Sequence, residues 1–238
     1  MPQAKYKRIL LKLSGETFLG KRPYGIDPEF TLWLAREIIK AQKLGAQVSV
    51  VVGGGNIFRG TSAAEHGLER TVADYIGMLA TIMNSLALQA ALEKEKQDVR
   101  VLTSIEIKDV AEPYIRRRAL RHLEKGRVVI YAGGTGNPYF TTDTTAALRA
   151  LETQCQIILK GTKVDGVYDR DPQKHKDAKK FETLSFKQAI TEKDIEILDN
   201  SALSLCMDHN IPILVFDLNK EGNIEKAVLG EKIGTLIS

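Results

Sequence analysis

Short apolar segments alternate with longer amphipathic segments along the chain. Residues 8–13 and 46–52 are dominated by Leu, Ile and Val, which predicts strands buried on both faces. Between them, from Pro28 to about Gly45, apolar residues recur at helical spacing, and Asp27 precedes this segment as an expected N-cap. The same criteria predict strands at 99–103, 127–132, 157–159, 213–216 and 235–237, and helices at 71–96, 114–125, from about 142, at 194–209 and at 223–229.

The alternation of strands and helices predicts the fold class. Strands that are separated by helices of this length pair in parallel and are covered on both faces. We therefore expect an α/β protein, a three-layer α/β/α sandwich around a mainly parallel sheet, with residues 1–238 in one domain. Because ligands of such sheets bind beyond the carboxyl ends of the strands, the segments that follow the strands are the candidates for a site.

Composition limits the possible classes. Of 238 residues, 43% are apolar and 27% are charged, as in ordinary globular proteins, and the net charge of +4 favours a small anionic ligand without requiring nucleic acid. No apolar run approaches the roughly 18 residues that a membrane span needs, and the N-terminus shows no signal-peptide pattern. We therefore expect a cytoplasmic protein with no membrane and no nucleic-acid partner.

The segment 51–60, V-V-G-G-G-N-I-F-R-G, follows a predicted strand and is the most informative in the chain. Its glycines, Gly53–Gly55, can turn the backbone through angles that other residues avoid and let another group approach closely. Consecutive N–H groups in such a turn converge on an anion, and Arg59 adds a forked cation. The segment predicts a phosphate cradle; the alternative is a tight turn with a surface arginine.

The first strand ends in K-L-S-G-E at residues 12–16. If the chain transfers phosphoryl groups, Lys12 neutralises the moving group and Gly15 lets the loop close over phosphates; the alternative is an edge lysine beside a turn glycine. Residues 15–21 match most of a P-loop, but Arg22 replaces the Ser or Thr that binds magnesium, and turn residues follow where a helix must begin. A P-loop is therefore rejected.

A second glycine-rich segment spans residues 132–147, A-G-G-T-G-N-P-Y-F-T-T-D-T-T-A-A, and leads into a predicted helix. The N-terminus of that helix offers free N–H groups to a phosphate, and Tyr139 or Phe140 can pack on a base or ribose. Asp143 either caps the helix or orients Lys12 and Lys163 at the reacting group. The alternative is a capped helix after a glycine loop. Side-chain donors come from Thr135, Asn137, Thr141 and Thr142.

A third segment, L-K-G-T-K-V-D-G-V-Y-D-R-D-P at residues 159–172, adds cations at Lys160 and Lys163 and a donor at Thr162. Tyr168 can stack against an adenine, although the segment taken alone is better explained as a charged surface hairpin. Lys12, Arg59 and Lys163 thus arrive from separate strand ends, with no candidate general base. This arrangement suits phosphoryl transfer to an acceptor that is already an anion, with Mg²⁺ carried mainly by nucleotide phosphates.

Segments 12–16, 52–60, 73–81, 135–143 and 160–168 occur in the order and spacing of the bacterial UMP kinases, also called uridylate kinases, of the amino acid kinase fold. The resemblance covers essentially the whole chain. It implies the reaction of ATP with UMP to give ADP and UDP, with Mg²⁺, in pyrimidine and CTP biosynthesis. It also implies an N-terminal lobe to about residue 150 with the phosphate acceptor, and a C-terminal lobe over 151–238 with ATP.

The resemblance assigns site residues by motif position. Asp143 would orient the lysines, and Asp199 would be a structural aspartate near the site. Charge would be neutralised by Lys12, Arg59 and Lys163. ATP would contact Lys12, Leu13, Ser14, Gly15, Gly55, Arg59, Thr162, Tyr168 and Asp171. UMP would contact Gly54, Asp74, Thr135, Gly136, Asn137, Pro138, Tyr139, Phe140, Thr141 and Thr142.

The same resemblance implies a homohexamer built as a trimer of dimers, activated by GTP and inhibited by UTP. Arg100 and Arg127 stand at the positions expected for a GTP site, whereas Glu93 does not suit a triphosphate. Two alternatives stay open. One is a kinase of the same fold that acts on carbamate or acetylglutamate. The other is a non-catalytic nucleotide sensor that binds nucleic acid through the basic segment 114–125.

Overall fold

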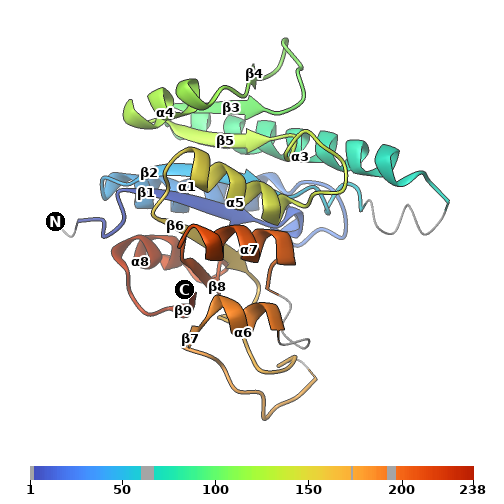
Figure 1. The fold of residues 1–238 in the computed structure, drawn as a ribbon. Coiled ribbons are helices and arrows are strands. Elements are labelled where there is room, and N and C mark those ends of the chain that lie inside the picture. The colour runs from blue at the N-terminus through green and yellow to red at the C-terminus, as the bar shows by residue number, and fades with distance from the viewer. Residues whose placement is uncertain (1–2, 60–66, 173, 192–196) are drawn as a thin grey trace.

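A computed structural model describes residues 3–59, 67–172, 174–191 and 197–238. Its centre is a nine-stranded sheet in the order β4-β3-β5-β2-β1-β6-β8-β9-β7 (Figure 1). Neighbouring strands from β4 to β8 pair in parallel, whereas β9 is antiparallel to β8 and pairs in parallel with β7. The strands are β1 (Arg8–Leu13), β2 (Gln47–Val52), β3 (Val99–Thr103), β4 (Glu112–Pro113), β5 (Val128–Ala132), β6 (Ile157–Thr162), β7 (Thr183–Leu184), β8 (Ile213–Asp217) and β9 (Gly234–Ile237).

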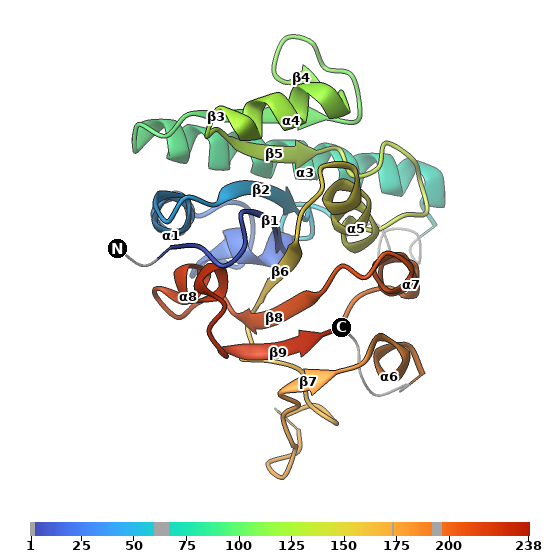
Figure 2. The same ribbon diagram turned by 60° about the vertical axis from the view of Figure 1, so that its left-hand side comes forward.

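Helices cover both faces of the sheet, so the predicted three-layer α/β/α class is confirmed (Figure 2). One face packs against α1 (Pro28–Lys43), α3 (Arg70–Lys94) and α8 (Asn223–Leu229). The opposite face packs against α4 (Arg116–Glu124), α5 (Thr142–Glu152), α6 (Phe186–Thr191) and α7 (Asn200–Asp208). A short 3-10 helix, η1 (Gly15–Leu19), follows β1.

Alternation along the central strand β1 positions the first candidate residue. Ile9, Leu11 and Leu13 belong to the core under α1, α3 and α8, whereas Leu10 belongs to the core under α5 and α7. Because side chains alternate along a strand, Lys12 points to the same face as Leu10. Lys12 also stands opposite Lys160 in the parallel pairing of β1 with β6. The two lysines therefore lie side by side on one face of the sheet.

The long strands and helices match their predicted positions within a few residues, including the Asp27 N-cap of α1, which accepts hydrogen bonds from the backbone N–H groups of Glu29 and Phe30. Four elements were not predicted: η1, β4, β7 and α6. Each is six residues or shorter, so none carries enough periodicity to be recognised. The helix predicted at 194–209 begins at Asn200, and residues 192–196 lie outside the described part. The division into lobes near residue 150 stays a prediction.

The expectation that no segment is apolar enough to span a membrane needs a correction. Helix α3 is long and apolar enough by length and composition, because scattered polar residues interrupt its apolar runs without lowering the average far. Half of its most apolar window is buried in the protein, and the helix packs against α1, β3 and β5. In this fold α3 is therefore a core helix with one exposed face.

Candidate active site

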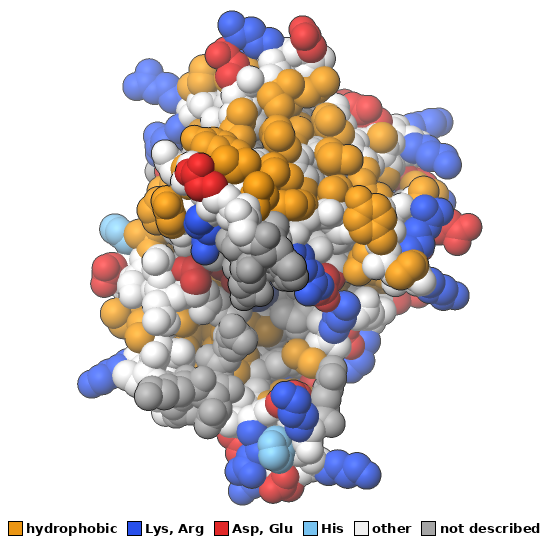
Figure 3. All heavy atoms as spheres, turned by 90° about the vertical axis from the view of Figure 1, so that its right-hand side faces the viewer, with side chains coloured by type: hydrophobic (Ala, Val, Ile, Leu, Met, Phe, Trp, Pro, Cys, Tyr) orange, Lys and Arg blue, Asp and Glu red, His pale blue; other side chains and the backbone are white. Residues whose placement is uncertain are grey.

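The motif segments meet at one edge of the sheet, where the carboxyl ends of β1, β2, β5 and β6 lie together. In Figure 3 this edge faces the viewer, with apolar side chains gathered in its upper half and charged side chains around and below them. Gly60 belongs to the first glycine motif but lies outside the described residues. Among the remaining motif residues, charged side chains form two ion-pair clusters, and others line two cavities.

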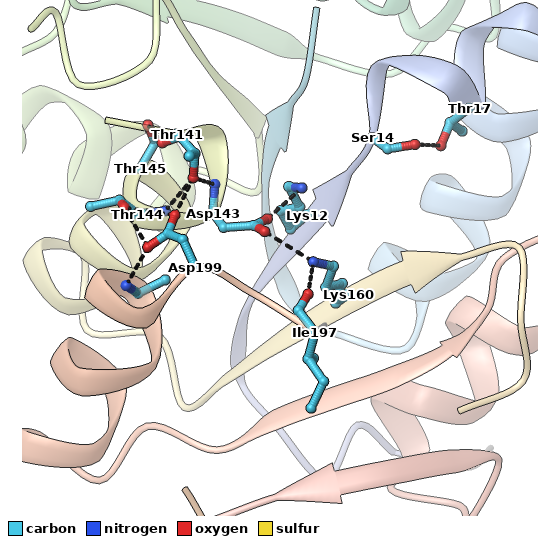
Figure 4. A network of polar contacts seen from close by, with 11 residues as sticks. Lys12, Ser14, Thr17, Thr141, Asp143, Thr144, Thr145, Lys160, Ile197 and Asp199 are labelled. Carbon is cyan, nitrogen blue, oxygen red and sulfur yellow. Dashed lines mark hydrogen bonds and ion pairs between the residues drawn. The ribbon is translucent and has the colours of Figure 1, made fainter. Parts of the chain in front are cut away.

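The first cluster, which we call the buried trio, consists of Lys12, Asp143 and Lys160 (Figure 4). Lys160 Nζ lies 3.0 Å from Asp143 Oδ2, and Lys12 Nζ forms an ion pair with Asp143 Oδ1. Asp143 comes from the first turn of α5, directly over the paired lysines of β1 and β6. The three side chains are 8%, 16% and 14% exposed in this order, so their charges interact with little screening by water.

The trio shifts the pKa values of Asp143 and Lys160. Burial alone would raise the pKa of Asp143, but the nearby charges and hydrogen bonds of Lys12 and Lys160 outweigh burial and hold that pKa below its ordinary value. Burial lowers the pKa of Lys160, and repulsion from Lys12 lowers it further, against the opposing attraction of Asp143. Asp143 is therefore an anion at neutral pH, as the neutraliser of two crowded cations must be.

Asp199 fixes the place of Asp143. It is the N-cap of α7, where its carboxylate accepts a hydrogen bond of 2.7 Å from the Ala202 N–H. The same carboxylate accepts the hydroxyl hydrogens of Thr141 and Thr144. Thr141 in turn caps α5 by accepting from the N–H groups of Asp143 and Thr144. Asp199 thus ties the N-termini of α5 and α7 together, which gives the expected structural aspartate a definite geometry.

The second cluster, the exposed trio, consists of Arg59, Glu16 and Lys163. Lys163 Nζ lies 2.9 Å from Glu16 Oε2, and Arg59 pairs with Glu16 Oε1. The side chains are much more exposed, at 59% for Arg59, 37% for Glu16 and 63% for Lys163. The hydrogen bond from Lys163 and the charges of both cations lower the pKa of Glu16. The predicted pairing of Lys163 with Asp143 is wrong for this structure, because Lys160 takes that place and Lys163 lies against Glu16.

The first glycine cradle needs glycines because other parts of the backbone approach it closely. None of Gly53–Gly55 has a positive φ, so the expectation of unusual backbone angles is wrong there. A Cβ on Gly54 would lie 2.8 Å from Gly77 O of α3, and one on Gly15 would collide with the Gly55 N–H. The loops after β1 and β2 therefore pack backbone against backbone. Asn84, buried on α3, anchors them by donating to Gly53 O over 2.7 Å.

The second glycine cradle does need unusual angles. Gly133, Gly134 and Gly136 have φ values of 74°, 59° and 83°, which favour glycine. Tyr139, with φ of 70°, also has a left-handed backbone, and its N–H donates to Asp74 Oδ2 over 2.8 Å. Helix α3 thus holds this loop as well, because Asp74 lies on it.

Two cavities adjoin the buried trio. One, of about 520 Å³, is lined by Lys160, Ile197 and Val215 and by three residues predicted for ATP, namely Thr162, Tyr168 and Asp171. The other, of about 380 Å³, is lined by residues predicted for either nucleotide, namely Gly54, Gly55, Arg59, Asp74, Phe140, Thr141 and Thr142. The trio therefore contributes Lys160 to the wall of the first cavity, and its Asp143 directly follows Thr142, a residue that lines the second.

Other predicted residues do not line these two cavities. The side chain of Leu13 is fully buried in the core. Ser14 Oγ lies 3.3 Å from Thr17 Oγ1 beside a smaller hollow of 60 Å³ that Lys163 also lines. Thr135 and Asn137 hydrogen-bond each other within their loop. Lys12, Gly15, Gly136, Pro138, Tyr139 and Asp143 complete the set that lies outside the two linings.

Sequence reasoning missed several residues of the site. The sequence motifs indicate Lys160 only as an additional cation, yet a lysine inside the otherwise apolar strand β6 is a signal, because charged residues are seldom buried without a partner. Arg70 also lines the second cavity, and its Nε lies 2.9 Å from both carboxylate oxygens of Asp74. Its spacing of four residues from Asp74 on a predicted helix was a usable signal.

The basic helix α4 and the expected GTP residues lie in a separate region. Arg116 donates to Glu152 O over 2.5 Å, and Arg118 lies 3.6 Å from Glu112. Arg100 also lies 3.6 Å from Glu112, and Arg127 Nη1 lies 3.0 Å from His122 Nδ1. Several of these cations thus have protein partners. Among the described residues, no group of three or more His, Cys, Asp or Glu side chains is placed to hold a metal ion.

Comparison with known proteins agrees with this geometry. Residues 7–217 match the amino acid kinase family. The structure is similar to UMP kinase from Bacillus anthracis, with 42% identity, 98% of this chain and 96% of that chain covered, and a TM-score of 0.94. It is also similar to UMP kinase from Ureaplasma parvum, with 38% identity, 98% and 99% covered and a TM-score of 0.91. Uridylate kinase from Archaeoglobus fulgidus matches at 31% identity, with 97% and 99% covered and a TM-score of 0.74. The chain therefore belongs to the amino acid kinase family and is a nucleotide-binding phosphotransferase.

Proposed function

We propose that this enzyme transfers the γ-phosphoryl group of ATP to the phosphate of UMP, giving ADP and UDP. The single observation that carries the proposal is the buried trio, with Lys160 in the wall of one cavity and Asp143 next in the chain to Thr142 in the wall of another, each cavity being lined by residues predicted for a nucleotide. The substrate follows from the similarity to three proteins described as UMP or uridylate kinases. ATP would occupy the cavity beside Tyr168, and UMP the cavity beside Asp74.

The chemistry asks little of the protein beyond position and charge. An oxygen of the UMP phosphate attacks the γ-phosphorus of ATP, the bond from that phosphorus to the β,γ-bridging oxygen breaks, and ADP leaves with the electron pair. No proton has to move, because the acceptor is already an anion. Lys12 and Lys160 stand where negative charge builds up, and Asp143 holds both ammonium groups in place.

The exposed trio gives the site its second pair of cations. Glu16 holds Arg59 and Lys163 beside the first glycine cradle. In our proposal the phosphates of ATP replace Glu16 as the partner of these cations. Mg²⁺ would enter with ATP, held mainly by the nucleotide phosphates, and would neutralise part of their charge.

The test is ADP release with Mg-ATP and, in parallel, UMP, CMP, dUMP, carbamate, acetylglutamate or no acceptor. We expect turnover that depends on UMP. Turnover with carbamate or acetylglutamate instead would assign the site to another acid kinase of the same fold. If the folded protein binds ATP but turns over with none of the acceptors, it is a nucleotide sensor.

We also propose an assembly of several identical chains, the hexamer that the resemblance implies. Helix α3 exposes Val72, Tyr75, Leu79 and Met83, each between 43% and 53% accessible, and such a face fits a contact between copies. Light scattering on the purified protein tests this directly. Activation by GTP, inhibition by UTP and a cytoplasmic location belong to the same proposal, and titration of each nucleotide in the UMP assay tests the first two.

A further inference from the structure

We propose that Arg149 and Ser104, which line neither cavity, are positioning residues that brace the acceptor loop of residues 133–136. The inference rests on the proposed function only for the identity of the acceptor. The brace itself is a property of the free protein. Arg149 lies in α5, two turns from the helix N-terminus that forms one wall of the acceptor cavity, and Ser104 directly follows β3.

The Arg149 guanidinium is held from three directions. It is 5% exposed as a residue, and Nη1 donates to Glu152 Oε2 over 2.6 Å. Its centre lies 3.7 Å from the ring centroid of Tyr114, whose hydroxyl donates to the same carboxylate oxygen over 2.6 Å. A buried arginine with a carboxylate and an aromatic face as partners has little freedom to move. Its remaining branch, Nη2, donates to Ser104 Oγ over 2.8 Å.

The chemistry of arginine fixes the direction of the next bond. A guanidinium has only donors, so Ser104 Oγ accepts from Arg149 and must send its own hydrogen elsewhere. That hydrogen goes to Gly134 O, 2.8 Å away. The result is a directed chain from the body of α5 through Ser104 to the acceptor loop. Gly134 lines the acceptor cavity, so the chain ends at the site.

The loop also packs closely against the segment that contains Ser104. A Cβ on Gly136 would lie 3.1 Å from Ser104 Cβ, and one on Gly133 would lie 2.8 Å from Thr103 Oγ1. Ser104 N donates to Ala132 O over 3.0 Å, which continues the β3–β5 pairing up to the loop. The opposite side of the loop is held by Thr81, whose Oγ1 accepts from Gly133 N over 2.9 Å. Since the loop lies between two supports, loss of one support changes where its N–H groups point.

The brace acts on the acceptor side of the site alone. Arg149, Ser104 and the loop do not line the larger cavity assigned to ATP. Positioning groups of this kind act by keeping binding residues in one geometry. Weakening the brace should therefore reduce affinity for the acceptor phosphate much more than affinity for ATP.

Ser104→Ala tests the inference, with Ser49→Ala as the matched control. Ser49 is equally small, is fully buried, and donates to the backbone oxygen of Ile9 over 3.0 Å, within the sheet and away from both cavities. Steady-state kinetics with UMP varied at saturating Mg-ATP, and the converse, give the two KM values. We expect Ser104→Ala to raise the KM for UMP at least tenfold, with the KM for ATP and kcat changed less than threefold. Ser49→Ala should leave both KM values unchanged.

Arg149→Lys and Arg149→Met extend the series. Lysine keeps the charge but cannot reach Glu152 and Ser104 with separate branches, so we expect an intermediate KM for UMP, and the methionine variant should give the highest. Equal changes in both KM values, or the same effect from Ser49→Ala as from Ser104→Ala, would overturn the proposal.

Hydrogen exchange of the ligand-free protein separates this proposal from the proposed function. The Gly136 N–H donates to Gly133 O over 3.0 Å, so its exchange reports the loop. We expect faster exchange at residues 134–136 in Ser104→Ala and no change there in Ser49→Ala. Unchanged exchange would reject the brace even if UMP is the substrate, whereas faster exchange in a protein that does not use UMP would reject only the acceptor's identity.

Discussion

The buried trio and the exposed trio use the same plan, one carboxylate between two cations, in opposite surroundings. Asp143 with Lys12 and Lys160 is largely shielded from water, whereas Glu16 with Arg59 and Lys163 is open to it. In the buried trio each charge needs its partners, because an unpaired buried charge is costly. In the exposed trio water can replace any partner, so the bonds contribute little and exchange easily. The comparison indicates that the buried trio forms a fixed centre of the site and that the exposed trio forms an adaptable rim.

The difference suits the two tasks that phosphoryl transfer sets. The centre must be in place before the reaction, because its advantage lies in needing no rearrangement as charge develops. The rim must let a nucleotide enter and leave, so cations that rest on an exposed carboxylate can move to phosphates. Asp143 and Glu16 would then differ in role: the first stays in its ion pairs throughout, and the second gives up its partners when ATP binds.

The largest expected effect comes from removing the central charge. Asp143→Asn leaves Lys12 and Lys160 close together without a counter-charge, so we expect kcat to fall by about 10²–10³-fold, as when one preorganised group of an active site is lost. Initial rates of ADP formation measure it, and circular dichroism confirms that the variant is folded. A near-normal rate in the folded variant would show that the buried trio is only structural.

The second prediction compares Lys160, which pairs with Asp143 in the structure, with Lys163, which was predicted to do so but pairs with Glu16. Lys160→Met leaves Asp143 paired with Lys12 but removes the buried hydrogen bonds from Lys160 to Asp143 and to Ile197 O, and we expect the free energy of unfolding to fall by about 1–2 kcal/mol. Lys163→Met removes an exposed partner, and we expect a change within about 0.5 kcal/mol. Urea unfolding of both variants measures the difference. Equal losses would remove the distinction between centre and rim.

A third, smaller effect concerns pH. The pKa of Asp143 is lower in the folded protein than its ordinary value of about 3.9, so its ion pairs stabilise the fold fully above that value and less as pH falls through the folded-state pKa. The difference in unfolding free energy between the wild type and Asp143→Asn should be constant above about pH 5 and shrink below about pH 4. A difference that stays constant into strong acid would argue against a paired, charged Asp143.

The smallest effect is expected at the rim. Glu16→Gln keeps the shape of the side chain but releases Arg59 and Lys163 from an ion-pair partner, so stability should change by less than about 0.5 kcal/mol. The KM for ATP should fall, because phosphates no longer compete with the Glu16 carboxylate. ATP titration at two salt concentrations measures this. A rise in that KM would mean that Glu16 holds the cations in their working positions.

The sequence predicted the layers of the fold and the edge where the site lies, because strand and helix periodicity extends over long segments. It also predicted that Lys12, Asp143 and Thr141 belong to one site, although not that Thr141 caps α5. It could not show that Lys160 stands opposite Lys12, because the register of β1 and β6 depends on packing between segments almost 150 residues apart. The brace through Ser104 could not be predicted for the same reason, since no local sequence pattern joins residues 104, 134 and 149.

Transfer of labelled phosphate in a single turnover tests the central claim most directly. Enzyme in excess is mixed with ATP labelled at the γ-phosphate, Mg²⁺ and UMP, and the products are separated, for the wild type and for Asp143→Asn. We predict that the wild type moves the label into UDP and that Asp143→Asn does so at least a hundredfold more slowly. Label in inorganic phosphate alone, no transfer by the wild type, or equal rates in both proteins would contradict the account.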